Sequence, residues 1–126
     1  MSVVALGIDL IECERIERIR REHGERFVAR VLTPAERAYC ERMKNPVPHI
    51  AGRFAAKEAI LKVLGTGWRG AIAWTDMEIL NNPAGQPEVT LSGHTATVAE
   101  RLGIKRVLVS ITHTDATAAA TAIGVG

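Results

Sequence analysis

The chain has 126 residues, of which 47% are hydrophobic and 24% charged, with a formal net charge of +2. These values are ordinary for one globular domain and argue against a disordered chain. The near-neutral charge and the 4% aromatic content give no sign of a nucleic-acid partner, and no apolar run could span a membrane. Cys13 and Cys40 have no metal-binding or redox spacing. We therefore expect one cytoplasmic domain over residues 1–126.

The first half of the chain predicts a buried strand, an amphipathic helix, a short helical turn and a capped helix. Their expected bounds are Val3–Ile8, Glu12–Glu22, Phe27–Leu32 and Thr33–Lys44. Thr33 precedes a proline and stands three residues before Glu36, which is the pattern of a capping box. The prolines of Asn45–Pro48 should separate this helix from the next one.

The second half predicts a long helix, a hairpin, a shorter helix and a second hairpin. The expected segments are His49–Leu64, Trp74–Leu80, Glu88–Leu91, Ser92–Leu102, Arg106–Thr112 and Ala116–Gly124. This order lacks the regular alternation of a doubly wound fold. It predicts an α+β fold in which the long helix packs on a mainly antiparallel sheet.

The long helix is apolar around most of its circumference, yet it carries four charges. Arg53 and Lys57 form one i,i+4 row, and Glu58 and Lys62 form the next. An i,i+4 salt bridge within the second row is the ordinary interpretation. The three-to-one excess of positive charge, beside the glycine-rich turn at 65–67, instead favours an anion as the partner of these charges.

Two further polar positions follow apolar strands. Asp9 could cap the helix after it, or it could pair with Glu58 around a divalent cation, since two carboxylates completed by phosphate and water are typical of Mg²⁺. His113 stands between Thr112 and Thr114 and is a candidate phosphate contact. The histidines lack zinc spacing, and no serine stands in a nucleophile elbow.

Five motifs occur in a fixed order along nearly the whole chain. They are Gly7–Glu12 followed by Arg15-Ile16, Arg53–Lys62, Gly65–Gly67 with Trp74–Ile79, Gly85–Pro87, and Ser110–Thr114. Together they resemble the small bacterial 4′-phosphopantetheinyl transferases, the holo-acyl-carrier-protein synthases. That family moves the 4′-phosphopantetheine arm of coenzyme A to a serine of apo-acyl carrier protein and releases adenosine 3′,5′-bisphosphate. The turn at Asn82–Ala84 departs from members with a longer polar loop.

The resemblance implies a role for each matched residue. Asp9 and Glu58 would bind Mg²⁺, and Glu58 would also orient a water that takes the serine proton. Lys62 would stabilise charge on the transferred phosphate, so Glu58 and Lys62 are the expected catalytic residues. The implied coenzyme A contacts are Arg53, Lys57, Lys62, Gly65, His113 and Thr114.

The resemblance also implies an acidic carrier protein as partner and a homotrimer with its sites at subunit junctions. The region from the first helix to Arg30 is rich in arginine but diluted by glutamate, so a solvated charged face is the ordinary interpretation. The resemblance favours carrier binding by Arg15, Arg18, Arg21 and Arg26. The small apolar run Ala116–Val125 would suit packing between subunits.

Two other function classes fit the residues alone. A non-enzymatic module could hold an acidic partner on its arginine-rich helices, and it would not need Asp9 or Glu58. A Mg²⁺-dependent enzyme could cleave a pyrophosphate with water in place of a protein serine. Incubation with coenzyme A, Mg²⁺ and an apo-carrier protein would separate the three.

Overall fold

A computed structural model describes residues 2–67 and 72–126. Its elements in chain order are β1 (Val3–Glu12), α1 (Cys13–His23), α2 (Glu25–Val31), α3 (Pro34–Glu41), α4 (Pro46–Leu64), the 3₁₀ turn η1 (Trp74–Asp76), β2 (Met77–Asn81), β3 (Pro87–Leu91), α5 (Gly93–Arg101), β4 (Arg106–His113) and β5 (Thr117–Val125). Within these ranges, no helix combines the length and apolar character needed to cross a membrane.

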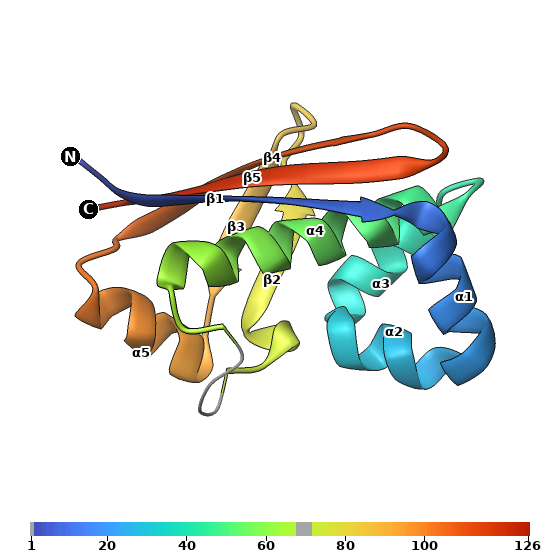
Figure 1. The fold of residues 1–126 in the computed structure, drawn as a ribbon, viewed down its shortest axis with the longest axis horizontal. Helices are drawn as coiled ribbons and strands as arrows, with labels where there is room; N and C mark the ends of the chain where they lie inside the picture. The colour runs from blue at the N-terminus through green and yellow to red at the C-terminus, as the bar shows by residue number, and fades with distance from the viewer. Residues whose placement is uncertain (1, 68–71) are drawn as a thin grey trace.

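The long helix α4 lies along one face of a three-stranded antiparallel sheet with the order β1-β5-β4 (Figure 1). A separate antiparallel pair, β2-β3, crosses behind α4 in this view. Helices α1 to α3 gather at one end of α4, and α5 lies at the other end. The predicted α+β class, with a long helix on an antiparallel sheet, is confirmed.

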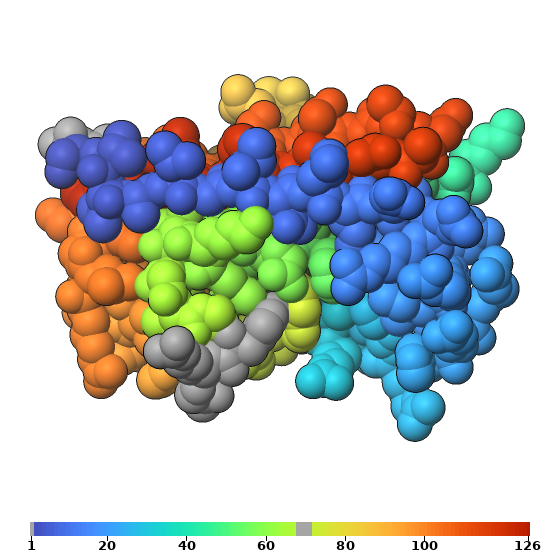
Figure 2. Space-filling view, in the orientation of Figure 1, coloured from blue at the N-terminus to red at the C-terminus, as the bar shows by residue number. Residues whose placement is uncertain are grey.

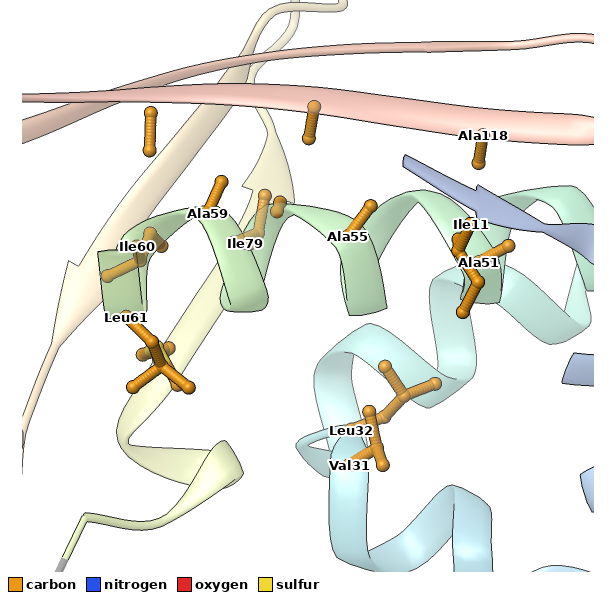
Figure 3. Close-up of a cluster of buried hydrophobic side chains, with 14 of the residues drawn as sticks. Ile11, Val31, Leu32, Ala51, Ala55, Ala59, Ile60, Leu61, Ile79 and Ala118 are labelled. Carbon is orange, nitrogen blue, oxygen red and sulfur yellow. The ribbon is translucent and has the colours of Figure 1, made fainter. Parts of the chain in front are cut away.

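Small residues form the contact between α4 and the sheet. Ala55 and Ala59 of α4 are fully buried, as are Ala118 and Ala122 of β5, where every second residue faces the helix (Figure 3). The expectation that the run Ala116–Val125 serves packing between subunits is therefore wrong for its buried alanines. Their role is within the chain, because alanine lets the backbones of helix and strand approach closely.

Glycines at three points bring helix and sheet closer still. A Cβ at Gly7 of β1 would clash with the carbonyl oxygen of Ala59 and lie 2.9 Å from the Cβ of Lys62. A Cβ at Gly52 or at Gly124 would stand 2.8 Å from a side chain of the opposite layer. No residue larger than glycine fits at Gly7 without moving backbone, so the position of β1 on α4 is narrowly fixed.

The long helix begins at Pro46 and not at His49, so the expected separator at Asn45–Pro48 is mostly its first turn. Prolines are tolerated there because the first backbone N–H groups of a helix have no partner within it. The side chain of Asn45 caps this end by accepting a hydrogen bond from the Val47 N–H at 3.3 Å. The preceding helix ends at Glu41, three residues before its expected end.

The first strand continues through Glu12, which overturns the interpretation of Asp9 as a helix cap. Asp9 lies inside β1, where it is paired with Ala120 of β5. The capping box of α3 is confirmed, since Thr33 and Glu36 make both of its hydrogen bonds.

The segment Trp74–Leu80, expected to be one strand, divides into η1 and β2. Asp76 ends the 3₁₀ turn and its side chain caps the start of α5. Its Oδ2 accepts hydrogen bonds from the Thr95 hydroxyl at 2.9 Å and the Thr95 N–H at 3.4 Å, whereas the Ser92 side chain makes no capping bond.

Gly7→Ala should lower the free energy of unfolding by about 2 kcal/mol or more, because the added methyl group meets the backbone of α4. Urea unfolding followed by circular dichroism measures the change. Ser110→Ala, at an exposed position of β4, is the control and should stay within about 0.5 kcal/mol of the parent. Equal stabilities of the two variants would refute the tight contact.

Candidate active site

The four charged side chains of α4 divide into two environments. Glu58 and Lys62 lie on a stripe that also holds Phe54 and that remains partly open to solvent. Arg53 and Lys57 point to the other side, where they are 3% and 0% exposed. The two rows expected from the sequence are therefore one partly exposed stripe and one part of the core.

The ammonium of Lys62 lies against the strand that carries Asp9. Its Nζ donates a hydrogen bond to the Ile8 carbonyl at 2.7 Å and lies 3.4 Å from Asp9 Oδ1. The Asp9 side chain is 20% exposed and that of Lys62 is 54% exposed. The lysine thus balances the charge of Asp9 while its head group stays accessible to a ligand.

The packing of β1 on α4 brings Asp9 toward Glu58. The two elements run in opposite directions (Figure 1), and Gly7 touches α4 at Ala59. Two strand residues span about 6.6 Å, close to the 5.4 Å pitch of a helix. Asp9 therefore lies opposite the preceding turn of α4, the turn that ends at Glu58.

Glu58 lines a surface depression together with Leu61, Lys62, Gly65 and Gly67. In Figure 2 this end of α4 is exposed directly below β1. Gly65 ends the helix in the left-handed conformation, with φ 72°, which suits a residue without a Cβ. The depression therefore lies at the C-terminal end of α4, on the side that carries Glu58 and Lys62.

The chemistry of these donors fits Mg²⁺. Among the described residues, no group of three or more His, Cys, Asp or Glu side chains is placed to hold a metal ion. A structural zinc site needs four nitrogen or sulfur ligands. A magnesium ion instead takes one or two carboxylates and completes its shell with water and substrate phosphate, which is what Asp9 and Glu58 can offer.

Lys57 is held by three oxygen atoms in the interior. Its Nζ donates to Glu36 Oε1 and to the Val31 carbonyl at 2.6 Å each, and to the Trp74 carbonyl at 3.2 Å. Burial lowers the pKa of Lys57, and the carboxylate of Glu36 opposes this effect. This burial contradicts the expectation that Lys57 contacts coenzyme A, because its ammonium has no exposed surface.

Arg53 is also directed inward. Its Nε donates to the Ile79 carbonyl at 3.1 Å, and its guanidinium lies 4.3 Å from the centre of the Tyr39 ring. Only 3% of its surface is exposed, and its Nη2 is buried with no hydrogen-bond partner among the described residues, so the expected contact of Arg53 with coenzyme A stays a prediction. A cation–π contact and a backbone acceptor therefore satisfy only part of the guanidinium group.

Glu36 is the residue of this cluster that the sequence did not identify, beyond its part in the capping box. It is fully buried, and its Oε2 accepts a hydrogen bond from the Ile79 N–H at 2.9 Å. The charges on an apolar helix signalled that partners must exist. They could not show that one partner would come from the capping box of α3.

His113 and Thr114 lie at the turn between β4 and β5, on the opposite edge of the sheet from Asp9. The His113 ring lies 5.0 Å from that of His49, and the Thr114 hydroxyl accepts hydrogen bonds from the N–H groups of Ala116 and Thr117. Burial, His113 and Arg53 lower the pKa of His49. One chain therefore does not bring His113 and the Glu58 depression into a single pocket.

The arginines expected to meet a carrier protein are exposed on α1 and at the start of α2. They are Arg15, Arg18, Arg21 and Arg26. Arg15 and Arg18 line a depression whose wall includes Leu10, the residue after Asp9. Arg21 has an acidic neighbour, Glu17, at 3.9 Å. The basic side of α1 therefore adjoins the edge of the sheet that carries Asp9.

An apolar surface that the sequence did not predict lies on the face of the sheet away from α4. Leu6, Ile8 and Leu10 are 69%, 59% and 69% exposed, whereas the sequence predicted a buried strand. The reason is that α4 covers one face of β1, and alternate residues of a strand point to opposite faces. Leu6 is paired with Ile123 of β5, which is paired in turn with Leu108 of β4.

Comparisons with known proteins find one matching family and several similar proteins. The profile of the 4′-phosphopantetheinyl transferase superfamily matches residues 5–122. A holo-[acyl-carrier-protein] synthase of Solibacter usitatus is 46% identical over 114 residues, covering 90% of this chain and 91% of that protein.

Two solved structures are also similar. The synthase from Neisseria meningitidis superposes with a TM-score of 0.91 at 33% identity, covering 99% of this chain and 100% of the other. The synthase from Helicobacter pylori, solved in complex with coenzyme A, gives a TM-score of 0.84 at 30% identity, covering 96% of this chain and 100% of the other.

Proposed function

The chain belongs to the 4′-phosphopantetheinyl transferase superfamily, and we propose that it transfers the 4′-phosphopantetheine group of coenzyme A to a serine of apo-acyl carrier protein. The second product is adenosine 3′,5′-bisphosphate. One observation carries the proposal: Asp9 Oδ1 of β1 lies 3.4 Å from the Lys62 ammonium, on the stripe of α4 that also presents Glu58. Such an enzyme would act in the cytoplasm and prepare the carrier for fatty-acid or polyketide synthesis.

Asp9 and Glu58 are the residues that would hold Mg²⁺. When bound, the ion would neutralise the charge of the coenzyme A pyrophosphate. Lys62 supports the same charge from its exposed position, because its ammonium can donate to a phosphate oxygen while the β1 carbonyl keeps it nearby. Glu58 has a second task, which is to orient a water that takes the proton of the attacking serine.

The arginines of α1 and α2 support docking of an acidic carrier. Arg15, Arg18, Arg21 and Arg26 are exposed, and the depression at Arg15 and Arg18 begins next to Asp9. A carrier bound there would bring its serine to the edge of β1. Rim charges of this kind act mainly on the rate of association and weaken with salt.

We further propose a homotrimer in which each coenzyme A site lies between two subunits. Lys62 and Gly65 stand at one edge of the sheet, whereas His113 and Thr114 stand at the other. A neighbouring chain can bring the second edge to the first, so that both pairs contact one coenzyme A. The exposed apolar residues of β1 offer a surface for this contact.

The direct test is incubation of the protein with coenzyme A, Mg²⁺ and an apo-acyl carrier protein, followed by mass spectrometry of the carrier. We expect the carrier to gain the mass of phosphopantetheine, and chelation of the metal should abolish the gain. Asp9→Asn and Glu58→Gln should each lower the rate by about a hundredfold or more, because each removes a carboxylate ligand.

Glu100→Gln, at an exposed position of α5, is the matched control and should keep the parent rate. Coenzyme A hydrolysis with an unchanged carrier would favour a water-using pyrophosphatase. Carrier binding without any reaction, unaffected by changes at Asp9 or Glu58, would favour a non-enzymatic module.

Lys62→Met should lower kcat by about tenfold or more and change the KM for coenzyme A less. The reason is that charge on the phosphate oxygens develops in the transition state, where an ammonium contributes most. Steady-state kinetics over a range of coenzyme A concentrations measures both constants. Lys105→Met, at an exposed position outside the site, should change neither. A rise in KM at constant kcat would make Lys62 a ground-state contact.

The trimer predicts that light scattering after size-exclusion chromatography gives three chain masses. Leu6→Glu should reduce the assembly, because it places a charge on the apolar surface of β1. Leu102→Glu is the control, since Leu102 is also an exposed apolar residue, at 44%, but lies at the end of α5. A monomeric parent protein, or equal disruption by both variants, would contradict this interface.

A further inference from the structure

We propose that Lys57 and Glu36 form a buried positioning pair. The pair sets the orientation of the open stripe of α4, which consists of Phe54, Glu58 and Lys62, and phosphopantetheine transfer depends on this orientation. This inference rests on the proposed function, because it assigns the open stripe a role in that reaction. Neither residue touches a substrate in this arrangement. They would act through the side chains that they hold in place.

The pair forms a closed set of hydrogen bonds. The ammonium of Lys57 has three N–H donors and three acceptors: the Val31 carbonyl at the end of α2, Glu36 in α3, and the Trp74 carbonyl in η1. Glu36 accepts in addition from the N–H groups of Thr33 and Ile79. Each of the three N–H donors of Lys57 therefore has an acceptor in a different segment. The single Nζ atom ties α4 to α2, α3 and η1.

A contribution to stability is a weak explanation for such a pair. Both side chains are fully buried, and removing two charges from water costs about as much as their attraction returns. Apolar residues of similar size often stabilise a core equally well. What an ion pair with five directed hydrogen bonds adds is a defined geometry.

That geometry reaches the open stripe by two routes. Glu58 follows Lys57 directly in the helix, so holding Lys57 in the core fixes the rotation that turns Glu58 to the edge of β1. The second route passes through Trp74, whose carbonyl is held by Lys57 and whose ring stacks on Phe54 with centroids 4.9 Å apart. Phe54 lies one turn before Glu58 on the same stripe.

The experiment compares Lys57→Met, Glu36→Gln and the double variant with the parent protein in the transfer assay, and records thermal unfolding of each. Lys57→Met should lower kcat by about tenfold or more while the KM for coenzyme A stays within about threefold. The double variant should unfold at a higher temperature than Lys57→Met, because it leaves no unpaired buried charge. Its kcat should nevertheless remain low.

Lys44→Met, at an exposed position before α4, is the matched control and should behave as the parent. If kcat in the double variant recovers together with the unfolding temperature, the pair is only structural and the inference is wrong. If the KM for coenzyme A rises at constant kcat, Lys57 contacts the substrate, which also overturns it.

A further variant tests the inference even if Lys57→Met does not fold. Trp74→Leu removes the stack on Phe54 and keeps the backbone carbonyl that Lys57 binds. We expect its kcat to fall by about threefold or more, whereas an unchanged kcat would overturn the route through Trp74. A parent protein without transfer activity would overturn the proposed function itself, which the variants alone cannot do.

Discussion

The close contact of α4 with β1 and β5 determines where every other part of the site stands. At Gly7 there is no room for a side chain between the strand and the carbonyl of Ala59, and buried alanines line much of the contact. A helix that approaches a sheet this closely cannot slide or turn without backbone clashes. The carboxylate of Asp9 and the stripe with Glu58 are thereby held together, although they are far apart in the sequence.

The side of α4 that faces away from the sheet is held by charged side chains, whereas the side on the sheet packs through small residues. Lys57 and Glu36 occupy the core between α4 and the helices α2 and α3, and Arg53 extends the same side toward Tyr39. The helix is therefore fixed sterically on one side and by directed hydrogen bonds on the other. Between these two contacts remains the narrow stripe on which Glu58 and Lys62 can meet a substrate.

The sequence could predict the elements that depend on local signals. The capping box at Thr33 and Glu36, the terminal hairpin and the class of the fold all follow from short patterns, and the structure confirms them. It could not predict which charged row of α4 is open. A helix that is apolar almost all round gives no amphipathic signal, so the environment of Lys57 depends on Glu36, which is distant in the sequence.

The same limit explains the first strand. An apolar run such as Val3–Ile8 does not distinguish a strand covered on both faces from one covered on a single face. In the structure Leu6 and Ile8 are exposed because α4 covers only the side of Gly7 and Asp9. The order β1-β5-β4 then separates Asp9 from His113 by a whole strand. The proposed homotrimer answers this separation, because a neighbouring chain would bring its His113 to the edge that carries Asp9, and the exposed face of β1 would be the surface of contact.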